Sequence, residues 1–257
     1  MSESTPRPRV ALLVTCLVDL FRPSVGFAAV KLLEEAGCEV AVPLQSCCGQ
    51  PAYNSGERDK ARDVARTMLD ALEGYDHVVA PSGSCAGMVV KHYPDLFEGD
   101  ADEARARDLA GRTFELTRYL VEVAGVTDFS ATLDATVTYH DSCSCLREAG
   151  VREQPRTLLD GVGDLALEEA RDREVCCGFG GTFAAKYPAV SAAMARDKAD
   201  RLEETGASVA IAADMGCLLN IAGTLKRRGS TMEVRHIAEI LAGDTTTPAI
   251  AEGEAER

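Results

Sequence analysis

The sequence predicts an α/β protein of two pseudo-symmetric three-layer lobes, each with a mostly parallel sheet. Two observations support this prediction. Short apolar runs without strict polar alternation recur along the chain, as is typical of strands buried on both faces of a parallel sheet. In addition, a Cys-Cys-Gly triplet occurs twice, at 47–49 and at 176–178, each time between one upstream and one downstream cysteine. We therefore expect two related halves with the same order of elements.

The spacing of the cysteines is nearly the same in the two copies. The upstream separations are 31 and 33 residues, and the downstream separations are 37 and 40. This repeated frame uses eight of the ten cysteines: Cys16, Cys47, Cys48, Cys85, Cys143, Cys176, Cys177 and Cys217.

Each predicted strand leads into one of these cysteines. The strands of the first half are expected at 10–15, 39–43 and 77–80, and those of the second at 137–140, 165–168 and 208–213. Ligands of open parallel sheets bind beyond the carboxyl ends of the strands. We therefore expect the motif cysteines at strand C-terminal ends, where they converge.

Helices are expected between the strands. Segments 23–36, 57–74 and 188–205 carry apolar stripes, two of them begin with proline, and glycines follow or close them. A longer helix over 102–125 is expected to join the halves. The predicted lobes are 9–125 and 126–243, and the polar segment 244–257 is expected to be a disordered tail.

The overall composition limits the classes of partner. A formal net charge of −14 argues against nucleic acid or an anionic membrane surface, because both need clustered Lys and Arg. The N-terminal segment lacks the apolar core of a secretory signal, and no apolar run is long enough for direct membrane insertion. We expect a cytoplasmic protein, whose reduced cysteines are metal ligands or redox groups rather than disulfides.

The positions of the eight cysteines favour a cofactor over simple core packing. They lie in loops rich in glycine and serine, whereas Cys38, which has no counterpart in the second half, is expected to pack in the core. A Cys₄ zinc site usually combines two Cys-x₂₋₄-Cys pairs, and no such pair of knuckles is present. Four cysteines per half match an iron–sulfur cluster in each lobe.

Several longer motifs carry a family resemblance. They are Cys47-Cys-Gly-Gln-Pro-Ala-Tyr-Asn-Ser-Gly56, Ser82-Gly-Ser-Cys85, His140-Asp-Ser-Cys143, Cys176-Cys-Gly-Phe-Gly-Gly-Thr-Phe183 and Cys217-Leu-Leu-Asn-Ile-Ala-Gly223. The chain resembles the cysteine-rich (CCG) domain iron–sulfur family, which includes the cysteine-rich component of heterodisulfide reductase and the glycolate oxidase iron–sulfur subunit. Within it, the motifs are most similar to those of the lactate utilisation A proteins, from about residue 10 to 241.

The resemblance implies an iron–sulfur electron-transfer subunit of a cytoplasmic system that oxidises L-lactate to pyruvate. Its partners would be the sister lactate utilisation proteins, a ferredoxin-like iron–sulfur subunit and a third subunit. The cofactor would be a [4Fe–4S]-type cluster, one or two per chain, held by the eight cysteines of the frame. No catalytic residue is assigned, and the chain would be a non-catalytic or co-catalytic subunit of an L-lactate dehydrogenase complex.

The sequence departs from the wider family at one position in each half. The family often closes its frame with Cys-x-x-Cys, but Ser82 and Asp214 replace the first cysteine here. Four thiolates per lobe remain, so the five-cysteine cluster of heterodisulfide reductase is not carried over, and an oxygen ligand from Ser82 or Asp214 is an alternative. Cys145 is a second candidate for the place of Cys143, because it lies 31 residues before Cys176.

Other interpretations stay open from the sequence. The chain could instead serve a glycolate, glycerol-phosphate or disulfide oxidoreductase, or be a zinc- or thiol-based redox protein without iron. His140 either tunes a cluster or is a structural strand-end histidine, and His236 is expected in a helical stretch. Lys186 and Arg147 either bind an anion or are solvated surface residues.

Overall fold

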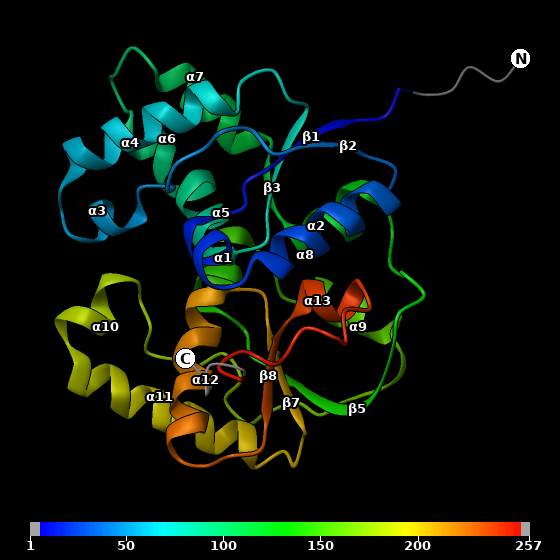
Figure 1. The fold of residues 1–257 in the computed structure, drawn as a ribbon. Coiled ribbons are helices and arrows are strands. Elements are labelled where there is room, and N and C mark those ends of the chain that lie inside the picture. Colours follow the sequence, from blue (N-terminus) through cyan, green and yellow to red (C-terminus); the bar gives the residue numbers. More distant parts are fainter. Residues whose placement is uncertain (1–5, 253–257) are drawn as a thin grey trace, which may run out of the picture.

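The computed structural model describes residues 6–252 as two α/β lobes, which lie one above the other in Figure 1. Each lobe contains a four-stranded sheet in which every pair of neighbouring strands is parallel. The strand orders are β2-β1-β3-β4 and β6-β5-β7-β8, so the second sheet repeats the topology of the first. The predicted fold class is confirmed.

The first lobe carries the N-terminal elements. Its strands are β1 (Arg9–Leu12), β2 (Glu39–Ala41), β3 (His77–Ala80) and β4 (Thr113–Glu115). Its helices are α1 (Cys16–Phe21), α2 (Pro23–Glu35), α3 (Gln50–Asn54), α4 (Arg58–Ala71), α5 (Gly83–Gly87), α6 (Tyr93–Leu96), α7 (Glu103–Gly111) and α8 (Leu116–Arg118), with π-helical segments η1 (Met88–His92) and η2 (Tyr119–Ala124).

The second lobe repeats this order with fewer helices. Its strands are β5 (Thr132–Tyr139), β6 (Gly163–Leu167), β7 (Val209–Ala212) and β8 (Glu233–His236). Its helices are α9 (Gln154–Asp160), α10 (Thr182–Lys186), α11 (Pro188–Glu203), α12 (Met215–Arg227) and α13 (Ile237–Leu241), with a π-helical segment η3 (Cys145–Ala149).

The central strands form the core of each lobe. The apolar side chains of β1 and β7 are buried, as expected for strands covered on both faces. Each buried Val, Leu or Ile contributes about 1.5–3 kcal/mol. In both sheets the strand order reverses between the two central strands, β1 and β3 or β5 and β7. Such a switch point leaves a crevice at the C-terminal ends of the strands. The motif cysteines come directly after these ends and so lie at the crevice.

The two lobes pack through contacts that the pseudo-twofold symmetry repeats. Helix α1 contacts α12 and η3 contacts α5, while α2 contacts α13 and α9 contacts α8. The α2–α13 junction contains a buried ion pair in which the guanidinium of Arg22 donates to Glu239 at 2.7 Å. Ser24 donates to the same carboxylate at 2.6 Å. The cysteine-bearing ends of the two sheets therefore face a shared junction.

The predicted helix over 102–125 is wrong. The chain forms α7, then β4, and then α8 and η2 in this interval. The short run Thr113-Phe114-Glu115 pairs in parallel with β3 and completes the first sheet. Its counterpart β8 was also missed, and His236 lies at the end of that strand and caps α13 rather than lying inside a helix.

The segment after residue 243 differs from the predicted tail over the part that the structure describes. Ile250 is buried, and its backbone N–H donates to the carbonyl of Val234 at 2.9 Å. The guanidinium of Arg22 donates to the carbonyl of Pro248 at 2.6 Å. Residues 248 and 250 therefore contact the first and the second lobe respectively, and residues 253–257 lie outside the described residues.

Within residues 6–252, no helix combines the length and the apolar character that crossing a membrane requires.

Candidate functional site

Two cysteines of each lobe sit at the first turn of a helix that follows a central strand. Cys16 begins α1 just after β1, and Cys143 begins the helical turn after β5. Cys85 is the third residue of α5, and Cys217 is the third residue of α12. The positive end of a helix favours a thiolate over a thiol. These four positions therefore suit anionic sulfur ligands.

The Cys-Cys-Gly triplets form the third side of each site. Both glycines, Gly49 and Gly178, have a φ of +85°, a left-handed conformation that glycine adopts without strain. A Cβ at Gly178 would lie 2.7 Å from the carbonyl oxygen of Ser191, and one at Gly49 would lie 3.2 Å from that of Ala61. The glycine thus allows each cysteine pair to lie directly against the following long helix.

A side chain also anchors the backbone of each triplet. The Tyr93 hydroxyl donates to the carbonyl of Cys48 at 2.9 Å, and the Asn220 amide donates to the carbonyl of Cys177 at 2.9 Å. The buried second cysteine of each pair is therefore held by a different residue in the two lobes.

The sulfur atoms of each lobe converge. In the first lobe, the thiol of Cys48 donates to the sulfur of Cys85 at 3.4 Å. The burial of the cysteines follows one pattern in both lobes: the first two of each frame are half-buried and the last two are buried. All ten cysteines lie in the described part of the chain, and none of them forms a disulfide. The structure thus brings each predicted set of four cysteines together.

The electrostatics of each frame is compatible with a bound cation. Hydrogen bonds from Cys16 and Cys48 lower the pKa of Cys47, and hydrogen bonding to Cys47 and burial raise the pKa of Cys16 and that of Cys48. The second lobe repeats this pattern, with a lowered pKa for Cys176 and raised values for its neighbours Cys143 and Cys177. One thiolate thus suppresses ionisation of its neighbours, and a bound metal removes that repulsion.

The donor set fits an iron–sulfur cluster. Each lobe offers four cysteine sulfurs, the usual ligand number for such a cluster. Backbone N–H groups also point at sulfur, as where Gly178 donates to the sulfur of Cys176 at 3.3 Å. Such hydrogen bonds stabilise negative charge on sulfur ligands. Soft thiolates select iron–sulfur clusters, zinc or copper(I), and they disfavour magnesium and calcium.

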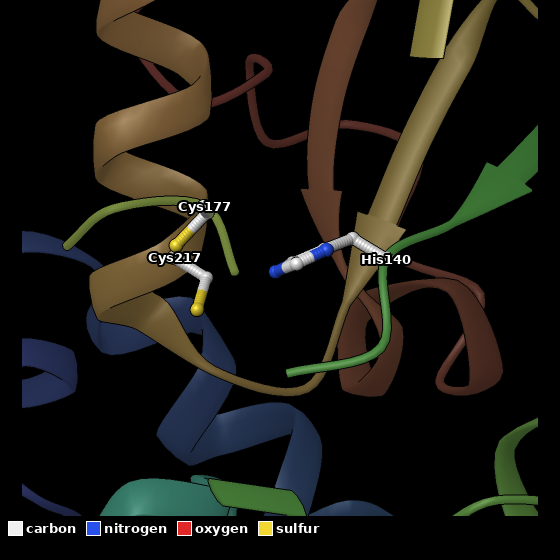
Figure 2. A group of neighbouring side chains, drawn as sticks. All are labelled: His140, Cys177 and Cys217. Carbon is white, nitrogen blue, oxygen red and sulfur yellow. The ribbon is translucent and has the colours of Figure 1, made fainter. Parts of the chain in front are cut away.

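The second site has an additional donor. Figure 2 shows the imidazole of His140, at the end of β5, pointing toward Cys177 and Cys217. Potential ligand atoms of these three residues lie within 4.8 Å of one another. Burial lowers the pKa of His140 to about 3, so the imidazole is neutral at pH 7. The structure therefore places His140 at the site, as one of the two sequence interpretations expects.

Lys198 is a functional candidate that the sequence analysis missed. It lies on the buried face of α11, with 1% of its surface exposed, and donates to the carbonyls of Asp172 and Arg173 at 3.1 and 3.0 Å. A signal was present, because Lys198 lies seven residues after the buried Ser191 and so on the same face of this helix. A charged residue on a helix face that packs inward indicates a specific partner.

Ser82 and Asp214 meet at the junction between the lobes. The Ser82 hydroxyl donates to Oδ2 of Asp214 at 3.2 Å, and the backbone N–H of Ser84 donates to the same oxygen at 2.8 Å. The other carboxylate oxygen accepts from the backbone N–H of Gly216 at 3.1 Å and caps α12. Oδ2 of Asp214 thus joins the two lobes and Oδ1 caps α12, so both oxygens already have protein partners.

The side chain of Cys145 packs against the first lobe. Its sulfur lies against Gly83 of α5, where an added Cβ would come within 2.1 Å of it. The thiol is buried at the lobe junction, and this burial raises its pKa. Cys143 is the residue that contacts Cys176. Cys38 is buried in the core beside the Tyr119 hydroxyl at 3.4 Å, as expected for a cysteine outside the frame.

The remaining polar candidates lie on the surface or have structural partners. Arg147 is exposed, and the exposed Lys186 donates to the Ser55 hydroxyl of the other lobe at 3.2 Å. His236 is buried at the end of β8, where one ring nitrogen lies 3.1 Å from the carbonyl of Pro81. None of these three side chains is placed in a cysteine frame.

A cavity of about 320 Å³ opens onto the first site between the lobes. All four cysteines of the first frame line it, and the second lobe contributes Phe179, Thr182 and Met215 to its wall. A second cavity of about 580 Å³ reaches Cys16 and Cys47 from the outer side of the first lobe. The first site is therefore reachable from two directions.

Comparisons with known proteins agree with this geometry. A family model described as "Cysteine-rich domain" matches residues 10–90 and 137–222, one match for each lobe. "Lactate utilization protein A" of Bacillus subtilis (strain 168) is 48% identical over 235 residues, which cover 91% of this chain and 98% of that protein. The protein of the same description from Oceanobacillus iheyensis is 46% identical, over 91% of this chain and 96% of its own length.

A solved structure shows the same fold at low sequence identity. The crystal structure of a hypothetical protein from Helicobacter pylori superposes with a TM-score of 0.65 at 12% identity. The match covers 95% of this chain but only 50% of the longer Helicobacter chain. At this identity the likeness concerns the fold alone.

Proposed function

The chain belongs to the cysteine-rich domain family and, within it, to the group of lactate utilization A proteins, and we propose that it is the iron–sulfur electron-transfer subunit of a cytoplasmic system that oxidises L-lactate to pyruvate. The observation that carries this proposal is the convergence of four cysteines at the strand ends of each lobe. A single frame would support a single metal site, whereas two related frames in one chain suit a protein that passes electrons between centres.

The residues of the chain have separate tasks in this proposal. Cys16, Cys47, Cys48 and Cys85 hold a cluster of the [4Fe–4S] type in the first lobe. The equivalent ligands in the second lobe are Cys143, Cys176, Cys177 and Cys217. A bound cluster supplies one-electron oxidation and reduction. Helix N-termini, left-handed glycines and backbone N–H groups hold the sulfurs in place and stabilise their negative charge.

The substrate chemistry belongs to the assembled system. The relatives are named for lactate utilization and carry the letter A, which supports sister lactate utilisation proteins as partners, a ferredoxin-like iron–sulfur subunit and a third subunit. We assign this chain the role of a non-catalytic or co-catalytic subunit of an L-lactate dehydrogenase complex. With a net charge of −14, its surface is complementary to a basic partner.

The first test is the metal content. The full chain is purified without oxygen and reconstituted, and iron, zinc and acid-labile sulfide are quantified. We expect iron and sulfide together with broad absorption near about 400 nm, as is general for cluster charge transfer. Cys38→Ala is the matched control, because this buried cysteine lies outside both frames and its loss should leave the iron content unchanged. Zinc alone, or no metal, after reconstitution would reject the iron–sulfur assignment.

The second test is substrate choice. The chain is combined with its sister proteins, and reduction of an artificial electron acceptor is followed with L-lactate, glycolate or glycerol 3-phosphate. We expect reduction with L-lactate, dependent on the presence of this chain. A preference for glycolate or glycerol 3-phosphate would favour the alternative that the chain serves a related oxidoreductase.

A further inference from the structure

The side chain of His140 is buried at the second site with little polar contact to the rest of the chain. It is 1% exposed, and among the residues that the structure describes neither ring nitrogen makes a hydrogen bond of good geometry, although the carbonyl of Arg173 lies near enough to raise the pKa of the imidazole. Its backbone N–H donates to the carbonyl of Ile211 at 2.8 Å, which fixes the residue at the end of the sheet. Burying unpaired polar atoms costs free energy unless a bound group satisfies them. Figure 2 shows that this imidazole points at two sulfurs of the second frame.

A buried cation approaches the same site from another helix. The Lys198 ammonium uses two of its three hydrogens on the carbonyls of Asp172 and Arg173, just before the second Cys-Cys-Gly triplet. Burial lowers the pKa of Lys198, and the negative charge of Cys177 acts in the opposite direction. Asp141, the residue after His140, is paired with Arg156 at 2.8 Å. The charges of Cys177, Asp141 and Cys217 all favour the protonated form of Lys198 against its burial.

The first lobe has apolar residues at both positions. Leu13 lies three residues before Cys16, as His140 lies three before Cys143, and its backbone N–H makes the equivalent bond to Val79 at 2.8 Å. The long helices can be aligned through the residues that face the two triplet glycines, Ala61 of α4 and Ser191 of α11. In this alignment Met68 occupies the place of Lys198.

We propose that His140 and Lys198 make the cluster of the second lobe easier to reduce than that of the first, so that a chain carrying one electron holds it in the second lobe. The inference rests on the proposed function, because it assumes a cluster in each lobe. A reduced cluster carries one more negative charge than an oxidised one. A nearby ammonium and an imidazole that binds iron or donates to a cluster sulfur both stabilise that charge. Leu13 and Met68, both fully buried, offer no such interaction.

The consequence is a direction for electron transfer inside the chain. An electron held by a cluster of the first lobe would pass to a cluster of the second lobe, so that the first would be oxidised as the second is reduced and no proton or further reactant would be needed. The first lobe would then face the electron donor and the second lobe the acceptor.

A redox titration of the reconstituted full chain tests the proposal. Reduction is followed by electron paramagnetic resonance, and we expect two reduction waves, one for each lobe. Repeating the titration with Cys48→Ala and with Cys177→Ala assigns each wave to its lobe. We expect the second lobe to be reduced first and His140→Leu to lower its midpoint potential. A tenfold change in the electron distribution between the lobes corresponds to about 59 mV for one electron. Lys198→Met should move the same wave in the same direction.

Two control variants separate the possible outcomes. Leu13→His should raise the wave of the first lobe, and His77→Leu, remote from both frames, should move neither wave. Two waves that stay in place in His140→Leu, at unchanged iron content, would overturn the inference while leaving the proposed function intact. Absence of iron in the wild type would instead overturn the proposed function.

A spectroscopic measurement covers the case in which His140→Leu loses iron from the second lobe. The wild-type chain is labelled with ¹⁵N-histidine, and nitrogen coupling to the reduced second cluster is measured by pulsed electron paramagnetic resonance. Coupling that changes with the label supports contact between the imidazole and the cluster. Its absence would refute that contact.

Discussion

The two lobes share their sheet topology and their cysteine frames, but the segments that lead into the Cys-Cys-Gly triplets differ. In the first lobe, residues 42–46 are mostly apolar and Leu44 is 98% exposed. In the second lobe, residues 168–175 are mostly charged, and residues 169–175 line a cavity of about 620 Å³. The cysteine frames of the two lobes are alike, whereas the segments around them differ. The two lobes therefore present similar sets of cysteines in different environments.

The difference extends from the surface to the interior. Around the first site, Leu20, Val42 and Leu44 are exposed beside a cavity that reaches two of the cysteines. Around the second site, a buried histidine and a buried lysine replace a leucine and a methionine. Equal thiolate sets in unequal surroundings are expected to differ in potential and in access. The following experiments test how far the symmetry holds.

Loss of one buried cysteine from either lobe gives the largest expected effect. Because each lobe supplies its own four sulfurs, Cys48→Ala and Cys177→Ala should each retain about half of the wild-type iron and sulfide. The double variant should retain neither. Iron and sulfide are quantified after anaerobic reconstitution, with the ultraviolet circular dichroism spectrum as a control for folding.

The same measurement can show that the two cysteine frames are not equivalent. Complete loss of iron in one single variant, with no loss in the other, would mean that only one frame holds metal. Cys145→Ala is the matched control within the second lobe, since the sulfur of Cys145 lies at the lobe junction against Gly83. It should keep its iron, whereas Cys143→Ala should lose the second-lobe share.

The next largest effect concerns the two symmetry-related junctions between the lobes. Glu239→Gln leaves the buried guanidinium of Arg22 without its charge partner, which typically costs about 3–5 kcal/mol. At the other junction Arg118 donates to the carbonyl of Ala149 at 2.9 Å from a more exposed position. Arg118→Gln should cost only about 0.5–1.5 kcal/mol. Urea unfolding of both variants measures the difference, and equal losses would show that the junctions are equivalent.

Much of the fold could be predicted because its signals are local or repeated. The apolar runs before the cysteines became strands at the expected places, and the proline and glycine boundaries located α2, α4 and α11 to within a few residues. The repeat of the cysteine frame predicted the pairing of the lobes. In both cases a short stretch of sequence contains enough information to specify the element.

The missed features depend on contacts between distant segments. β4 and β8 have four residues or fewer, and only the edge of a completed sheet makes them strands. The bond between Ser82 and Asp214 spans 132 residues and needs both lobes in place. Lys198 looks like a surface residue of an amphipathic helix until the neighbouring segment covers it. Propensity and spacing cannot report such tertiary contacts.

The glycines of the two Cys-Cys-Gly triplets, Gly49 and Gly178, are expected to differ in how much an alanine at each position lowers the unfolding free energy. An alanine at either position must adopt a left-handed conformation, which costs about 1–2 kcal/mol. Gly178→Ala also forces its Cβ against the Ser191 carbonyl and the Cβ of Met194, at 2.7 and 2.9 Å, and overpacking adds about 1–3 kcal/mol. At Gly49 the nearest atom is 3.2 Å away. The unfolding free energy should therefore fall further in Gly178→Ala, and the reverse order would contradict the tighter packing of the second triplet.

The smallest expected effect is a pH dependence that differs in sign between the two symmetry-related caps. Glu115 caps α8 and His236 caps α13, and both are buried. Burial raises the pKa of Glu115 from 4.5 to about 7, against hydrogen bonds from Thr117 and Arg118 that lower it. Burial lowers the pKa of His236 below 6.5. Each folded-state shift favours the neutral side chain.

The sign of the stability change follows from which state binds more protons. Between pH 4.5 and about 7 the folded chain keeps the proton on Glu115 that the unfolded chain releases, so this residue reduces stability as the pH rises, by at most about 3 kcal/mol. Below pH 6.5 the unfolded chain protonates His236 while the folded chain does not, so this residue reduces stability as the pH falls. Urea unfolding of the metal-free protein between pH 5 and pH 8 should show Glu115→Gln gaining on the wild type as the pH rises. His236→Gln should gain as the pH falls, and curves parallel to the wild type for both variants would show that the caps ionise alike in the folded and unfolded chain.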